Sequence, residues 1–273
     1  MTVTNGYITA ADLLTYLGGN FSTGNTNATM IDQAIDAASR AIDDEARRVF
    51  YPHVETNMYD VPPGRKLDLA DDLLELLTLT NGDAAVIPST NYIIAPYNSY
   101  PKNSIVLLSS SVYGFAPSTT NGDEAAISAY GIYGFHRRYL TAWQTGSTLA
   151  SGLTDSATSA TATSGTAFAN GQIVRIDNEL IRVTNVSTNT LTIERGWNGS
   201  TAAAHDAADL IKIWRPEAIV SQATKIQSAR YYRRFETVYG TTGGGEMGVQ
   251  PVQIPQLDPD VKQMLSGLYG SIL

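Results

Sequence analysis

The sequence predicts an α+β fold: a helical bundle made of N-terminal helices and a helix over 216–239, a β region, an inserted small antiparallel β domain and an extended C-terminal tail. Three observations predict it. Apolar residues recur at three- and four-residue steps over 31–49, and again over 219–239, as on the buried face of a helix. Between these segments the pattern changes to short alternating runs separated by Gly, Pro and Asn, which is typical of strands.

The chain is long enough for one large core or two smaller ones, since it has 273 residues of which 43% are hydrophobic. We assign residues 1–52 and 216–240 to the helical core and residues 53–144 to the β region. Residues 145–215 are assigned to an inserted antiparallel β module with a linker, and residues 241–273 to a flexible C-terminal tail with a short docking helix.

Capping signals mark the helices. Thr9 and Asp12 form a capping-box-like entry to the first helix, which Gly18 and Gly19 close. The third long helix begins at Pro216, where no amide donor is needed. On the long second helix an acid precedes a base by four residues, the favourable order, in the pairs Asp36 with Arg40, Asp43 with Arg47, and Asp44 with Arg48.

The β region should contain about six strands, including separate runs at 67–69 and 75–87, with a hairpin signal at Asn81–Gly82. Residues 145–166 are almost wholly small and polar, so we interpret part of them as a linker. The stretch 171–197 alternates and turns at Asp177, as a small antiparallel sheet should.

The tail ends in a short helix capped by Asp258 and Pro259. A helix this short is marginal alone, so we expect it to dock onto its own core or onto a neighbour. The apolar face that would dock consists of Val261, Met264, Leu265, Leu268 and Tyr269.

Composition excludes several classes of function. The chain has no cysteine, which excludes disulfides, thiolate zinc sites and a thiol nucleophile. No run of apolar residues reaches the ~18 that a membrane helix needs, and the first ten residues have no export signal, so we expect a soluble, unexported protein with no membrane partner. The net charge of −8 argues against wrapping nucleic acid, because affinity for phosphates comes from clustered Lys and Arg.

No residue pattern indicates catalysis. His53, His136 and His205 stand far apart and form no metal-binding pair on a helix, so we expect no metal and no cofactor. Asp177 and Glu179 could serve a hydrolase, but a solvated or ion-paired state explains them more simply. We therefore expect a protein that is not an enzyme, with a hydrolase as the weakest alternative.

A basic, aromatic group lies near the end of the third long helix. Arginines interleaved with tyrosines can touch nucleic acid, but the charge of the whole chain favours pairing with acids on a partner subunit. The expected subunit interface consists of Arg230, Arg233, Arg234, Asp43 and Asp44.

The order of these elements resembles the head-to-tail connector proteins of tailed bacteriophages, the adaptor group. The resemblance is carried by "SRAIDDEARRVFYP", "RPEAIVSQATKIQSARYYRRF" and "LDPDVKQMLSGL" and covers residues 7–52 and 216–270. The stretch from Leu67 to Leu108 looks like the β part of longer members. Residues 169–214 are similar to a small β module of several phage structural proteins, in which "RGWNG" and "AAAH" recur.

The resemblance implies a structural virion protein that forms a homo-oligomeric ring, normally dodecameric, in the neck of the virion, after assembly in the host cytoplasm. The ring would dock between the portal protein and a neck, stopper or tail-completion protein, and DNA would pass through it without specific binding. In such adaptors the C-terminal segment commonly reaches the portal, which here implies contact through the face from Val261 to Tyr269. The alternative is a baseplate or fibre-like module that recognises carbohydrate through Trp197, because aromatic faces are common ligand platforms.

Overall fold

The computed structural model describes residues 3–18, 25–237 and 257–270. Within these residues the chain is mostly β, with antiparallel sheets of five and six strands and five helices. The predicted fold class, a helical bundle with a small inserted β domain, is therefore wrong. The helices form one layer of a larger β protein, because the region between them contributes all the strands of both sheets.

The first sheet has the strand order β1-β5-β2-β4-β3. Its longest strand covers the run 67–69 and the first part of the run 75–87, up to Thr80, which we predicted as separate strands. Register shifts along it accompany its pairing with β4 and with β5. The Asn81 turn follows that strand, where the Asn81 N–H donates to the Ala85 carbonyl at 2.8 Å. The strands are β1 (His53–Tyr59), β2 (Lys66–Thr80), β3 (Tyr92–Ala95), β4 (Lys102–Leu107) and β5 (Ile127–Tyr133).

The second sheet has the strand order β6-β11-β8-β9-β10-β7. Residues 145–166 are not a linker in the structure, since they contribute to both edge strands and bury Leu149, Leu153 and Ala160. A small polar segment cannot fold alone, but at a sheet edge the neighbouring strands supply the large apolar side chains. The strands are β6 (Trp143–Thr148), β7 (Ser159–Thr161), β8 (Ile173–Ile176), β9 (Glu179–Ser187), β10 (Thr190–Glu194) and β11 (Leu210–Trp214).

Four helices pack together as a helical layer: α1 (Ala10–Leu17), α2 (Asn25–Ala46), α4 (Ala218–Thr237) and α5 (Pro259–Leu265). The predicted caps are confirmed at Thr9, which forms a capping box with Asp12, and at Asp258, which accepts from the Asp260 N–H with Pro259 at the first helical turn. Short helical turns lie outside the layer at α3 (Tyr139–Ala142), η1 (Ser89–Asn91) and η2 (Trp197–Gly199).

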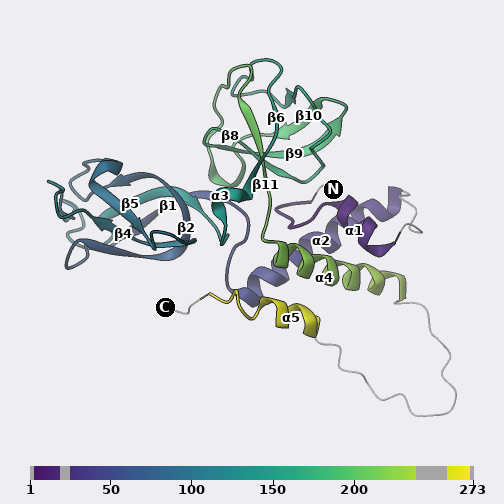
Figure 1. The fold of residues 1–273 in the computed structure, drawn as a ribbon, viewed down its shortest axis with the longest axis horizontal. Coiled ribbons are helices and arrows are strands. Elements are labelled where there is room, and N and C mark those ends of the chain that lie inside the picture. The colour runs from purple at the N-terminus through teal and green to yellow at the C-terminus, as the bar shows by residue number, and fades with distance from the viewer. Residues whose placement is uncertain (1–2, 19–24, 238–256, 271–273) are drawn as a thin grey trace, which may run out of the picture.

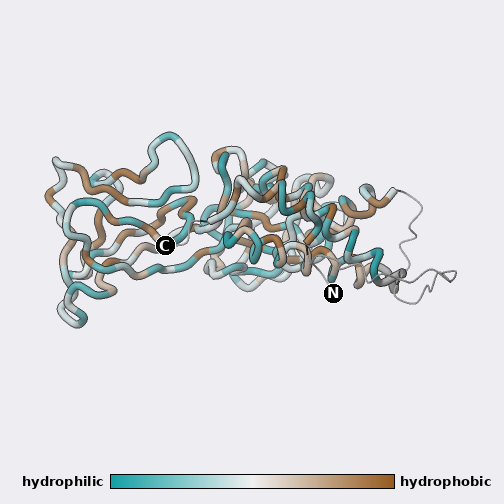
Figure 2. Tube along the Cα trace, turned by 90° about the horizontal axis from the view of Figure 1, so that it is seen from below, coloured by the Kyte–Doolittle hydropathy of each residue, from teal (hydrophilic) through white to brown (hydrophobic). Residues whose placement is uncertain are grey.

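The two sheets and the helical layer form three lobes (Figure 1). The first sheet lies at one end of the long axis and the helical layer toward the other, while hydrophobic and hydrophilic stretches alternate along the strands (Figure 2). The junction between the sheets is apolar and includes Val54 and Ile132 from the first sheet and Leu180 and Trp214 from the second. No helix of the described residues is long and apolar enough to cross a membrane.

Candidate functional site

The C-terminal helix α5 is docked on the chain's own helical layer, beneath α4 in Figure 1. Val261 and Leu265 are fully buried and Leu268 is almost so, and all three pack in one cluster with Phe50 and others. Met264 is partly buried against the same cluster, whereas Tyr269 is 44% exposed. Of the two docking partners that we expected, the chain's own core is the one observed, and most of the face expected to reach the portal is covered.

Polar contacts fasten the start of α5 to α4. The Asp258 N–H donates to the Gln227 side-chain oxygen at 3.0 Å, and Gln227 is itself buried. The Asp258 carboxylate lies 3.4 Å from the Arg230 guanidinium. Arg230 therefore serves the contact between tail and core within the chain, although we predicted it at a subunit interface.

Further contacts fasten the end of the tail to α2 and to the segment between β5 and α3. The Gly270 N–H donates to the Ala46 carbonyl at 2.8 Å, which satisfies an acceptor at the C-terminus of α2 that has no partner within the helix. The Arg137 guanidinium donates to the Gly267 carbonyl at 2.6 Å. We call the surface of α2 and α4 that α5 covers the tail dock.

The other predicted interface residues divide into two groups. Asp43 is turned into the chain, where it pairs with Arg40 at 3.1 Å and accepts a short hydrogen bond from the Tyr7 hydroxyl. Asp44, Arg233 and Arg234 are exposed on their helices. From the sequence we had paired Asp43 with Arg47, four residues later on the same helix. The contact with Tyr7 could not be predicted in this way, because Tyr7 lies far from Asp43 in the sequence.

The environment of Asp43 changes its proton affinity. Burial raises the pKa of Asp43 to about 7, although the Arg40 guanidinium and the hydrogen bond from Tyr7 oppose the shift. The Tyr7 hydroxyl also accepts from the Phe50 N–H at 3.1 Å, so one short network joins the N-terminal segment to the end of α2.

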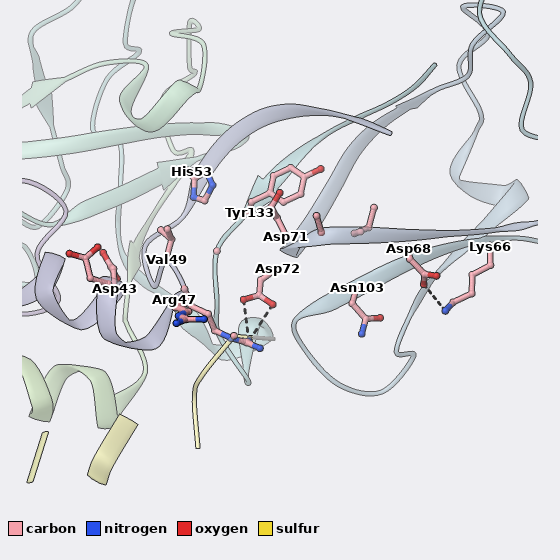
Figure 3. A pocket seen from close by; sticks show the side chains of 16 residues that line it. Asp43, Arg47, Val49, His53, Lys66, Asp68, Asp71, Asp72, Asn103 and Tyr133 are labelled. Carbon is pink, nitrogen blue, oxygen red and sulfur yellow. Dashed lines mark hydrogen bonds and ion pairs between the residues drawn. The ribbon is translucent and has the colours of Figure 1, made fainter. Parts of the chain in front are cut away.

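A charged groove of about 750 Å³ lies beside the tail dock, between the end of α2 and the first sheet (Figure 3). Arg48 pairs with Asp72 across it at 3.1 Å, and burial raises the pKa of Asp72 while Arg48 opposes the rise. Gly270 also lines the groove, so the tail and the groove form one continuous surface. The acidic, basic and histidine residues of the lining are Asp43, Asp44, Arg47, Arg48, His53, Lys66, Asp68, Asp71 and Asp72.

The lining decides what this groove can bind. Small-molecule sites are mostly apolar with a few placed polar groups, whereas this groove is dominated by charges of both signs with aspartates in excess. Mixed, partly exposed charges are suited to the rim of a contact between proteins, where they set orientation and partner choice. The groove is therefore a candidate assembly surface.

The segment from Arg195 to His205 is wrapped around one buried carboxylate. Glu179 on β9 accepts from Arg195 Nε and Nη2 at 2.7 Å each and from His205 Nε2 at 2.8 Å. It also accepts from the backbone N–H groups of Gly196 at 3.0 Å and Ala203 at 3.1 Å. These contacts give a structural reason for the "RGWNG" and "AAAH" pattern. Nothing in the spacing of the sequence indicated that Arg195 and His205 share a partner.

The same contacts bear on the hydrolase alternative. Burial alone would raise the pKa of Glu179, but the hydrogen bonds from Arg195, Gly196 and His205 outweigh it and lower the pKa below its usual value. A general acid needs a raised pKa, so Glu179 is suited to an ion pair and not to proton donation.

Trp197 lies at the junction between the second sheet and the N-terminal segment. Its indole N–H donates to the Asn5 side-chain oxygen at 2.7 Å, and the Arg182 guanidinium lies 4.8 Å from the ring centroid. Its neighbour Gly199 has a φ of 82°, and a Cβ at that position would overlap the Val54 carbonyl oxygen. One face of the Trp197 ring is therefore occupied by Arg182, which leaves less of it for a sugar than the carbohydrate alternative requires.

No protein-family model and no curated protein matches the chain.

Proposed function

We propose that this chain is a head-to-tail connector of the adaptor group, a structural subunit of a dodecameric ring in the neck of a tailed phage virion. The ring would join the portal protein to the next neck, stopper or tail-completion protein. One observation supports this most: the helices described within the two stretches that carry the resemblance, α1 and α2 on one side and α4 and α5 on the other, pack into a single helical layer although residues 53–215 separate them in sequence.

Copies of the chain would meet through charged surfaces. A closed ring needs a heterologous contact, in which one patch of each copy meets a different patch of the next. The charged groove carries more aspartates than basic residues, and Arg233 and Arg234 are exposed on α4. We assign the contact to these two patches, because complementary charges orient partners and disfavour incorrect ones.

The acidity of the chain is suited to a DNA channel. Each copy carries a net charge of −8, which a ring multiplies. DNA phosphates bind where Lys and Arg release counterions, so an acidic ring repels the duplex and lets it pass without specific binding.

The docked tail suggests how portal binding would proceed. The apolar face of α5 lies in the tail dock, so α5 has to leave the dock before Val261 and Leu265 can reach the portal. A helix of seven residues is not stable without a surface to pack against. After release from the tail dock, α5 would therefore bind in a groove on the portal.

Imaging of the neck in purified virions tests the connector function. The expected result is ring density at the portal that accommodates the helical layer and both sheets of each copy. Virions that contain the chain elsewhere, or lack it, would contradict the proposal. Tail deletion is a poor test, because loss of residues 249–273 would expose the cluster around Phe50 and disturb the helical layer.

Cross-linking tests tail release separately. Glu45 and Lys262 form an ion pair of 3.7 Å between α2 and α5, and the chain has no cysteine of its own. A Glu45→Cys, Lys262→Cys double variant joined by a short bismaleimide would hold α5 in the tail dock. We expect the joined protein to lose co-sedimentation with portal-bearing heads, and the same variant without linker to retain it. Equal binding of both would contradict tail release without contradicting the connector function.

A further inference from the structure

Three metal-ligating side chains converge at one end of the second sheet. Ligand atoms of Asp177, His205 and Asp209 all lie within 4.8 Å of one another. Asp177 lies in the turn between β8 and β9, His205 ends the segment wrapped around Glu179, and Asp209 directly precedes β11. Three separate segments of the chain are thus brought together.

The two carboxylates beside the His205 ring favour a cation at this position. Its side chain is only 2% exposed, its Nε2 lies 2.8 Å from Glu179 and its Nδ1 lies 3.2 Å from Asp177. Carboxylates only accept hydrogen bonds, so a neutral ring that donates through Nε2 leaves an acceptor nitrogen facing an acceptor oxygen. Either a second proton on the ring or a metal ion between Nδ1 and Asp177 removes this conflict.

Glu179 is placed as a positioning residue for such an ion. A histidine that binds a metal usually donates its other N–H to a carboxylate, which fixes the tautomer and the ring orientation. Glu179 is 1% exposed and is itself held by Arg195 at 2.7 Å, so the imidazole is oriented before any ion arrives.

An ion would have access and room for water. Asp177 and Asp209 line a hollow of about 450 Å³, together with Glu75, Arg175 and Lys212. The Arg175 guanidinium is paired with Glu75 at 2.7 Å, and it also donates to the Asp177 main-chain carbonyl and to the Asn178 side chain, so it holds the turn that carries Asp177. Lys212 is the remaining cation of this lining and is the group that an entering metal ion would have to outcompete.

We propose that Asp177, His205 and Asp209 bind one divalent transition-metal ion, with Zn²⁺ the best match. One imidazole nitrogen and two carboxylate oxygens suit Zn²⁺ and its neighbours, whereas Ca²⁺ and Mg²⁺ prefer oxygen ligands alone. The ion would tie the end of the wrapped segment to the β8–β9 turn in a chain that has no disulfide. This proposal is independent of the connector function, and it departs from our expectation of no metal, which rested on sequence spacing alone.

Titration of the untagged, full-length, metal-free chain with Co²⁺ chloride tests the site. We expect one Co²⁺ per chain by elemental analysis, visible d–d absorption, and displacement by Zn²⁺. Asp177→Asn and Asp209→Asn should each weaken binding at least about tenfold. Both changes keep an acceptor oxygen, including the one that receives the Asp206 N–H at 2.8 Å, so the fold should persist. Asp206→Asn is the matched control and should bind as the wild type does.

Three results would overturn the proposal. They are an absence of stoichiometric binding, binding that both substitutions leave unchanged, and an equal loss in the Asp206→Asn control. Nitrogen NMR of the wild type provides a readout that needs no variant. Zn²⁺ should shift the His205 Nδ1 resonance alone, whereas a ring that stays protonated on both nitrogens at saturating Zn²⁺ would show that the cation is a proton.

Discussion

Glu179 and Arg195 form a bidentate ion pair, in which Arg195 Nε and Nη2 each lie 2.7 Å from one carboxylate oxygen, and the two side chains are only 1% and 8% exposed. The pair joins β9 to the start of the segment that leads through η2 to His205. It is the polar centre of the second sheet.

We predict that Glu179→Gln lowers the free energy of unfolding of the second sheet by about 3–5 kcal/mol, because it leaves the buried Arg195 charge without its partner. Chemical denaturation monitored by tryptophan fluorescence would measure this. Asp68→Asn, which removes an exposed partner of Lys66, is the control and should change stability by less than about 1 kcal/mol. Equal losses of unfolding free energy in the two variants would show that the buried Glu179–Arg195 pair contributes no more to stability than an exposed pair.

Stability should depend on pH through Asp43. The folded chain keeps the Asp43 proton up to about pH 7, whereas the unfolded chain releases it near pH 4, so the folded state binds more protons between these values. The free energy of unfolding therefore falls as pH rises through that window, by at most about 1.4 kcal/mol per pH unit. Asp43→Asn should remove this part of the slope, and Asp44→Asn, an exposed neighbour, should keep it. Denaturation at pH 5, 6, 7 and 8 makes the comparison.

Leu265→Ala should loosen the tail without unfolding either sheet. Leu265 is fully buried in the tail dock, and removal of a buried leucine side chain typically costs about 2–5 kcal/mol. Here that loss favours detachment of α5, so amide hydrogen exchange in α5 should accelerate while exchange in the sheets stays constant. Gln263→Ala, on the exposed side of α5, should leave both unchanged. Unaltered protection of α5 in Leu265→Ala would refute the tail dock.

Gly199→Ala should destabilise the contact between η2 and β1. Gly199 has a φ of 82°, which alanine adopts with strain, and its new Cβ would overlap the Val54 carbonyl. We expect a loss of about 1–3 kcal/mol in the free energy of unfolding. Gly114→Ala is the control, because a Cβ there meets nothing within 4 Å. A melting temperature that is the same in both variants would argue against the close approach.

Short-range signals in the sequence were sufficient for the helices and their caps. The Thr9–Asp12 capping box, the Asp258 and Pro259 cap and the stripe from Ile31 to Ala46 all depend on residues within a few positions of one another, whereas Val49 lies beyond the end of α2. Such contacts form in the same way wherever the segment lies in the fold.

Contacts between residues that lie far apart in the sequence could not be predicted from these short-range signals. Such contacts are the reason why the fold class differs from the prediction. The small polar residues 145–166 join a sheet because distant strands complete their core, and the tail face of Leu265 is buried because α2 and α4 lie beneath it. Glu179 meets Arg195 and His205 only once β9 and the wrapped segment are folded together. The physical reason is that burial and charge pairing depend on separation in space, which composition and periodicity do not record.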